Sequence, residues 1–175
     1  NARQAGITTD AKYGARMRVA EFAADEAKPV VELPSRIRTQ NRATDLNARS
    51  ASREDKGNLK MWIEATDLMP TDGIVSKTAM DATRGASTDL EKVQKIYDWV
   101  VNNTYREPKV RGCGNGDIKA MLETGNLGGK CADINALFVG LCRAAGIPAR
   151  DVYGIRLVPS AFGYKELSGN PANLK

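Results

Sequence analysis

The sequence contains no histidine among its 175 residues. Imidazole is the only side chain whose ordinary pKa lies close to neutral pH, so it serves as both base and acid in most cysteine and serine acyl-transfer sites. No other residue type in the chain combines these roles, because lysine is a poor proton donor at pH 7 and no carboxylate can be placed by spacing alone. The absence excludes a complete Cys–His site built from these residues only.

Cysteine, aromatic residues and long apolar runs are also scarce. The three cysteines, at positions 113, 131 and 142, are too few for a disulfide framework and include no C-x-x-C pair, so we predict no metal site and no cofactor. No apolar run reaches the roughly 18 residues that a membrane-spanning helix needs. The net charge of +5 is spread thinly and is not interleaved with aromatic residues, so we expect no nucleic-acid partner.

The rest of the composition, 42% hydrophobic and 27% charged, is typical of a folded domain. Alternating apolar residues in 13–22 and a second extended run in 29–40 predict an antiparallel strand pair, with the polar residues 1–12 outside it. The polar stretch 41–58 predicts a loop, and 59–69 a short helix or irregular segment. We therefore predict a β region that is the remnant of an accessory domain (1–45), a linker (46–72) and a partial core domain (73–175).

Three helices are predicted ahead of the second cysteine, in 73–83, 88–101 and 118–123. The middle one has the clearest signals. Thr88 and Glu91 form a capping box, and an apolar stripe follows at helical spacing. The stripe comprises Leu90, Val93, Ile96, Tyr97, Val100 and Val101. The short third helix is expected to stop at Gly125.

The most informative stretch is Gly128-Gly129-Lys130-Cys131, which leads into a helix that the Gly-Ile-Pro sequence at 146–148 ends. A thiol at a helix start lies among unpaired N–H groups and at the positive end of the helix dipole, both of which favour a thiolate. Cys131 is therefore a candidate nucleophile, and the alternative is a small buried residue that closes the helix start. Cys142 is most simply a core residue. Cys113, in a glycine-rich loop, is either an unpaired thiol in a tight turn or a redox partner of Cys131.

This stretch resembles the core of the transglutaminase-like cysteine enzymes, particularly their bacterial members. The likeness rests on Gly-Gly-Lys-Cys-Ala-Asp at 128–133 and on Leu-Cys-Arg-Ala-Ala-Gly-Ile-Pro-Ala-Arg-Asp-Val-Tyr-Gly at 141–154, and it extends from about residue 89 to 162. It implies an α+β, papain-related fold in which the helix that carries the nucleophile packs on an antiparallel sheet. The strand predicted in 149–158 would begin that sheet, with Arg150 and Asp151 as structural residues.

The resemblance also implies that Cys131 works with a histidine and an aspartate on later strands. The family's histidine comes a few tens of residues after the Gly-Ile-Pro-Ala-Arg turn, and the sequence stops at about that point. We therefore expect a chain truncated before the histidine and aspartate, which lacks the C-terminal strands of its parent protein and is inactive as an amidase by itself. The cellular compartment stays open, with an exported or cell-envelope bacterial protein favoured.

Three functions follow as hypotheses. The first is acyl transfer to, or hydrolysis of, an amide in a protein or peptide substrate through a thioester on Cys131, whose backbone N–H is the expected oxyanion donor. The second is a catalytically silent module that binds a protein or cell-wall partner. The third is thiol redox chemistry between Cys113 and Cys131.

Overall fold

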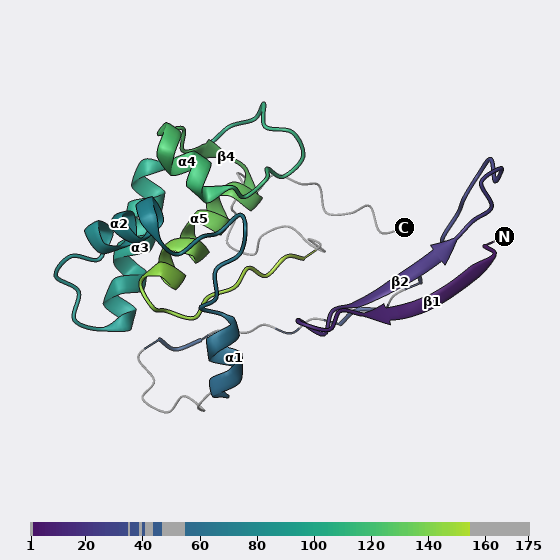
Figure 1. Ribbon diagram of the computed structural model, residues 1–175, viewed down its shortest axis with the longest axis horizontal. Coiled ribbons are helices and arrows are strands. Elements are labelled where there is room, and N and C mark those ends of the chain that lie inside the picture. The colour runs from purple at the N-terminus through teal and green to yellow at the C-terminus, as the bar shows by residue number, and fades with distance from the viewer. Residues whose placement is uncertain (1, 35, 39, 41–43, 47–54, 155–175) are drawn as a thin grey trace. The chain divides into compact units, whose positions relative to one another are not determined.

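The computed structural model describes residues 2–34, 36–38, 40, 44–46 and 55–154 (Figure 1). The chain forms two compact units, residues 1–50 and 51–175. The first contains an antiparallel hairpin and the second is mostly helical, so the predicted mixed α+β class is confirmed. The region boundaries predicted at residues 45 and 72 stay a prediction.

The first unit contains the hairpin of β1 (Gln4–Thr9) and β2 (Arg16–Glu21). The strands are antiparallel and in register from Gln4 opposite Glu21 to Thr9 opposite Arg16. The strand predicted within 13–22 is therefore present, but the partner predicted in 29–40 is wrong, as is the placement of 1–12 outside the sheet. The described residues of 29–40 have no regular secondary structure.

The connection between the two strands gives the physical reason for this difference. Gly14 has a φ of +67°, and its N–H donates to the Asp10 carbonyl at 3.0 Å. The Asp10 N–H donates in turn to the Ala15 carbonyl at 2.9 Å. Glycine adopts this left-handed conformation at little steric cost. The short closed turn pairs β2 with the strand that precedes it.

Five helices are described in the second unit: α1 (Lys56–Met61), α2 (Gly73–Ala82), α3 (Asp89–Asn103), α4 (Ile118–Thr124) and α5 (Cys131–Ala144). Helix α5 packs against α2, α3 and α4 (Figure 1). Its apolar face supplies much of the core of this unit. The buried core residues are Val75, Ala79, Ile96, Val100, Ile118, Met121, Ala136, Leu137, Leu141 and Cys142. The helix that begins at Cys131 is thus anchored along most of its length.

Helices α2 to α5 confirm the sequence predictions to within two or three residues at each end. Helix α4 ends at Gly125, whose φ of +69° is the expected left-handed cap. Helix α1 corrects the prediction of a loop through residue 58, because it begins at Lys56. Asp55 caps this helix by accepting hydrogen bonds from the backbone N–H groups of Gly57 and Asn58 at 2.8 and 3.2 Å.

Two short strands connect the segment after α3 to the segment before α5. β3 (Tyr105–Arg106) pairs in parallel with β4 (Gly128–Gly129), a pairing that the sequence did not indicate. The strand predicted in 149–158 is not present in its described part, 149–154, and the remainder lies outside the described residues. Within the described residues of the second unit, the one sheet is the parallel pair of β3 and β4, and the antiparallel core sheet is not seen there.

The capping box of α3 gives a first testable prediction. Thr88 accepts a hydrogen bond from the Glu91 N–H at 3.2 Å, and the Glu91 carboxylate accepts from the Thr88 N–H at 3.1 Å. Backbone hydrogen bonds from Ser87 and Thr88 lower the pKa of Glu91. We expect T88A to lower the free energy of unfolding by about 1 kcal/mol and T88S to change it much less. Urea denaturation of the three proteins measures this, and equal loss in T88A and T88S would contradict the cap.

Candidate active site

Cys131 is the first residue of α5, and its side chain is exposed. Lys130 before it has extended backbone, with φ −114° and ψ −165°, so the chain enters the helix directly from β4. The Ala132 N–H donates to the Cys113 carbonyl at 2.9 Å. Among the residues that the structure describes, the Cys131 N–H has no hydrogen-bond partner. One N–H beside the thiol is thus available to a ligand, while the next is occupied by the loop.

Asp133 holds the site together. Its carboxylate is buried, and Oδ1 accepts hydrogen bonds from the backbone N–H groups of Asn115 and Gly116, both at 2.9 Å. The second oxygen, Oδ2, accepts from the Lys130 N–H at 3.0 Å. One carboxylate therefore fixes both the loop that contains Cys113 and the start of α5. This role of Asp133 was not predicted from the sequence, although an acidic residue in the third position of a helix is a known capping signal.

The loop at 112–116 depends on glycine for its path. Gly112, Gly114 and Gly116 have φ values of +60°, +95° and +73°. At Gly114 a Cβ atom would overlap the Asp133 carboxylate. Glycine is required there both for its left-handed conformation and for the close approach of the carboxylate.

The three cysteines lie in different surroundings. The exposed thiol of Cys113 interacts with the thiol of Cys131, and their hydrogen bond raises the pKa of Cys113. The Cys131 sulfur also lies 3.9 Å from the Cys113 carbonyl oxygen. Cys142 is buried in the core, as its position on the apolar face indicated, and burial raises the pKa of its thiol to about 11. The structure thus brings together Cys113 and Cys131 and separates Cys142 from both.

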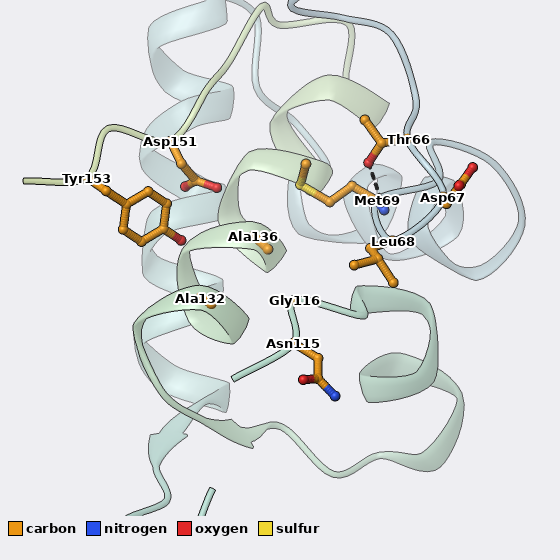
Figure 2. Close-up of a pocket in the computed structure, with 10 residues that line it drawn as sticks. All are labelled: Thr66, Asp67, Leu68, Met69, Asn115, Gly116, Ala132, Ala136, Asp151 and Tyr153. Atoms are coloured by element: carbon orange, nitrogen blue, oxygen red, sulfur yellow. Dashed lines mark hydrogen bonds between the residues drawn. The ribbon is translucent and has the colours of Figure 1, made fainter. Parts of the chain in front are cut away.

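A cavity of about 400 Å³ opens beside the first two turns of α5 (Figure 2). Figure 2 shows the Asp151 carboxylate and the Tyr153 hydroxyl pointing toward the part of the cavity near Ala132 and Ala136. The rest of the lining comes from Thr66, Asp67, Leu68, Met69, Asn115 and Gly116. Since Ala132 directly follows Cys131, the cavity adjoins the backbone of the candidate nucleophile.

Two ionisable groups on this cavity wall are shifted toward their protonated forms. Burial raises the pKa of Asp151, with the positive charge of Arg143 acting in the opposite direction. Burial also raises the pKa of Tyr153, and the negative charge of Asp151 adds to it. Asp151, predicted as a structural residue, therefore lies in a position to contact a bound group. Arg150 stacks instead over the Trp62 ring, 5.0 Å from its centroid.

Comparison with known proteins places this arrangement in a family. Residues 76–168, more than half of the chain, match the transglutaminase-like superfamily. The chain belongs to the transglutaminase-like superfamily. The resemblance noted around Cys131 is thereby confirmed, and the matched region includes α3, α4, the glycine loop and α5.

This transglutaminase-like chain is also similar to an uncharacterized protein of Haemophilus influenzae. The two are 38% identical over 164 residues, which cover 90% of this chain and 44% of the relative. The chain thus spans less than half the length of that relative. No solved structure matches the chain at a significant level.

Neither a metal-binding cluster nor a membrane-spanning helix is present in the described residues of this transglutaminase-like chain. No cluster of three or more histidine, cysteine, aspartate or glutamate side chains in the described ranges is placed to hold a metal ion. Likewise, no described helix is both long and apolar enough to cross a membrane. The candidate site consists of the thiol pair, the Asp133 carboxylate and the adjoining cavity.

Proposed function

We propose that this transglutaminase-like chain contributes the nucleophile of a cysteine enzyme that transfers or hydrolyses amide acyl groups. In this proposal Cys131 attacks the carbonyl carbon of an amide in a protein or peptide substrate. The observation that supports it best is the exposed thiol at the start of α5 beside a backbone N–H without a partner in the described residues. That N–H is suited to stabilise the oxyanion that develops during attack.

The first chemical step follows from this arrangement. The Cys131 thiolate forms a bond to the carbonyl carbon, and the carbonyl π electrons move to oxygen next to the Cys131 N–H. When the tetrahedral intermediate collapses, the C–N bond breaks and the amine leaves with a proton from a general acid. The resulting thioester then passes its acyl group to water or to an amine. Both outcomes use the same nucleophile.

In this proposal the general acid and base lie outside the 175 residues given, which contain no histidine. We assign these roles to the histidine and aspartate that accompany the cysteine in this family. We also propose that the segment from residue 149 onward leads into the antiparallel sheet of a papain-related core. The cavity beside Ala132 offers space for the acyl group of the substrate, with Tyr153 and Asp151 as hydrogen-bonding groups on its wall.

Thiol alkylation tests the assignment of the nucleophile. At pH 7.5 we expect iodoacetamide to modify Cys131 at least about a hundredfold faster than Cys142, because burial and the raised pKa of Cys142 leave very little accessible thiolate there. The C131S variant should lose the fast phase of alkylation, and the C142S variant should retain it. Peptide mass mapping identifies the modified residue. A Cys131 that reacts no faster than a cysteine in an unstructured peptide would contradict the proposed nucleophile.

A second candidate function is that of a catalytically silent module that binds a protein or cell-wall partner, and the absence of histidine favours it. Acyl capture distinguishes the two. With an activated ester as acyl donor, the proposed nucleophile forms a thioester on Cys131 that C131S cannot form and hydroxylamine removes. A silent module forms none. Under either proposal we expect no rapid turnover of an amide by these 175 residues alone. An enzyme that lacks one member of its catalytic triad loses most of its rate.

A further inference from the structure

We propose that Cys113 and Cys131 form a reversible disulfide, so that Cys113 is the resolving thiol of an oxidative modification site at the proposed nucleophile. The inference rests on the reactive thiol of the proposed function but requires no acyl transfer. Its basis is that both thiols are exposed and that the Cys131 sulfur lies 3.9 Å from the Cys113 carbonyl oxygen.

The backbones of the two cysteines are held close together. The Ala132 N–H, one residue after Cys131, donates to the Cys113 carbonyl at 2.9 Å. A disulfide requires Cα atoms within about 7 Å, and this hydrogen bond holds the two chain segments side by side, as such a bond needs. Bond formation then requires side-chain rotation and a small movement of the loop, while α5 stays folded.

The loop that contains Cys113 is also fixed just after the cysteine. Asn115 and Gly116 donate to the buried Asp133 carboxylate, at 2.9 Å each. The Cys113 thiol is therefore held beside Cys131 by the contact at its own carbonyl and by the contacts two and three residues after it. Cys142 cannot compete, because it is buried in the core eleven positions further along the same helix.

The oxidation balances with a hydroperoxide as the two-electron oxidant. The Cys131 thiolate attacks one oxygen of hydrogen peroxide, the O–O bond breaks, and the leaving hydroxide takes a proton to become water. Cys131 is then a sulfenic acid. The sulfur of Cys113 attacks the Cys131 sulfur, the S–O bond breaks, and the hydroxide leaves as water with the Cys113 proton. Two thiols are oxidised and one peroxide is reduced to two waters.

The surroundings of the two thiols favour this order of events. Its hydrogen bond with Cys131 raises the pKa of Cys113, which suits Cys113 to the role of the protonated, resolving thiol. The intermediate on Cys131 then meets a neighbouring thiol before further oxidation to the sulfinic acid. A dithiol reductant restores both cysteines by exchange. The modification would block the nucleophile reversibly.

Peroxide treatment of the chain, with intact mass and peptide mapping as readouts, tests the proposal. The reduced chain is treated with hydrogen peroxide and free thiols are then blocked with N-ethylmaleimide. We expect loss of two hydrogen atoms, a linked peptide pair that contains Cys113 and Cys131, and complete recovery with dithiothreitol. C142S should behave like wild type. A disulfide that includes Cys142, or one found only between two chains, would overturn the proposal.

The C113S variant supplies the decisive comparison. Serine keeps the backbone carbonyl that accepts from Ala132, so the loop contact survives, which circular dichroism and urea denaturation can verify. Without a resolving thiol, Cys131 of C113S should accumulate sulfenic acid that dimedone labels, while wild type shows almost none. Equal dimedone labelling in both proteins overturns the resolving role. If iodoacetamide modifies Cys131 rapidly but peroxide yields no disulfide, only the disulfide proposal is rejected. If iodoacetamide modifies Cys131 slowly, the proposed function is rejected as well.

Discussion

The D133A variant is expected to lose about 3–5 kcal/mol of the free energy of unfolding. The Asp133 carboxylate accepts three backbone hydrogen bonds, from Asn115, Gly116 and Lys130. Hydrogen bonds to a charged group contribute about 1.5–3 kcal/mol each, and donors left unpaired in a partly buried place cost more. Alanine removes the shared acceptor of all three at once. Urea denaturation monitored by circular dichroism measures the loss.

The D133N variant is the matched control for this prediction. The amide oxygen can accept from Asn115 and Gly116 as Oδ1 does, whereas the amide NH₂ group would face the Lys130 N–H and cannot accept its hydrogen bond. We therefore expect a smaller loss of about 1–2 kcal/mol for D133N. In D133A the loop also loses its two hydrogen bonds to the Asp133 carboxylate, so peroxide should yield much less disulfide. A D133A protein within about 0.5 kcal/mol of wild type would contradict the anchoring role.

The second large effect is expected at Arg143, a buried residue near the end of α5. Its Nε donates to the Ala149 carbonyl and its Nη1 to the Glu64 carbonyl, both at 2.9 Å. This side chain joins the segment before α2 to the segment after α5. We expect R143M to lower the free energy of unfolding by about 2–3 kcal/mol, because two carbonyl groups lose charged donors. Methionine retains much of the buried volume, so the loss reports mainly the hydrogen bonds.

Arg84 offers a matched control for R143M. Its guanidinium pairs with Asp81 at 2.7 Å, but the side chain is 82% exposed. Because exposed ion pairs contribute little, we expect R84M to change the free energy of unfolding by less than about 1 kcal/mol. R143M should also raise the pKa of Asp151 further, since it removes the positive charge that lowers it. Carboxyl NMR titration can follow that shift, and equal destabilisation by R84M and R143M would contradict the bridging role.

The features predicted from the sequence are those with local signals. Helix α3 begins at the capping box of Thr88 and Glu91, and α4 ends at the left-handed Gly125. The start of α5 at Cys131 followed from the preceding glycines and the apolar repeat behind them. Each of these signals lies within a few residues of the feature that it predicts, so no knowledge of distant contacts was required.

The features that were missed depend on residues distant in sequence or lack an apolar pattern. β1 has one large apolar residue, Ile7, and all six of its residues are exposed, so no periodicity marks it. β3 and β4 are two residues long, too short for alternation to show. Asp133 reaches partners 17 and 18 positions earlier, and Arg143 a carbonyl 79 positions earlier. Sequence spacing could reveal the chemistry of these residues but not their partners.

The Cys113 loop lies 17 and 18 positions before Asp133, the residue that anchors it, and this distance along the sequence affects the order in which the chain folds. The hydrogen bonds between the loop and Asp133 close chain segments of 17 and 18 residues, whereas α3 and α5 form from contacts four residues apart. Closing such loops adds an entropic barrier that helix formation does not meet. We therefore expect a refolding chain to build its helices before it brings the two thiols together, and during that interval Cys131 and Cys113 can each attack disulfides of other chains by thiol–disulfide exchange.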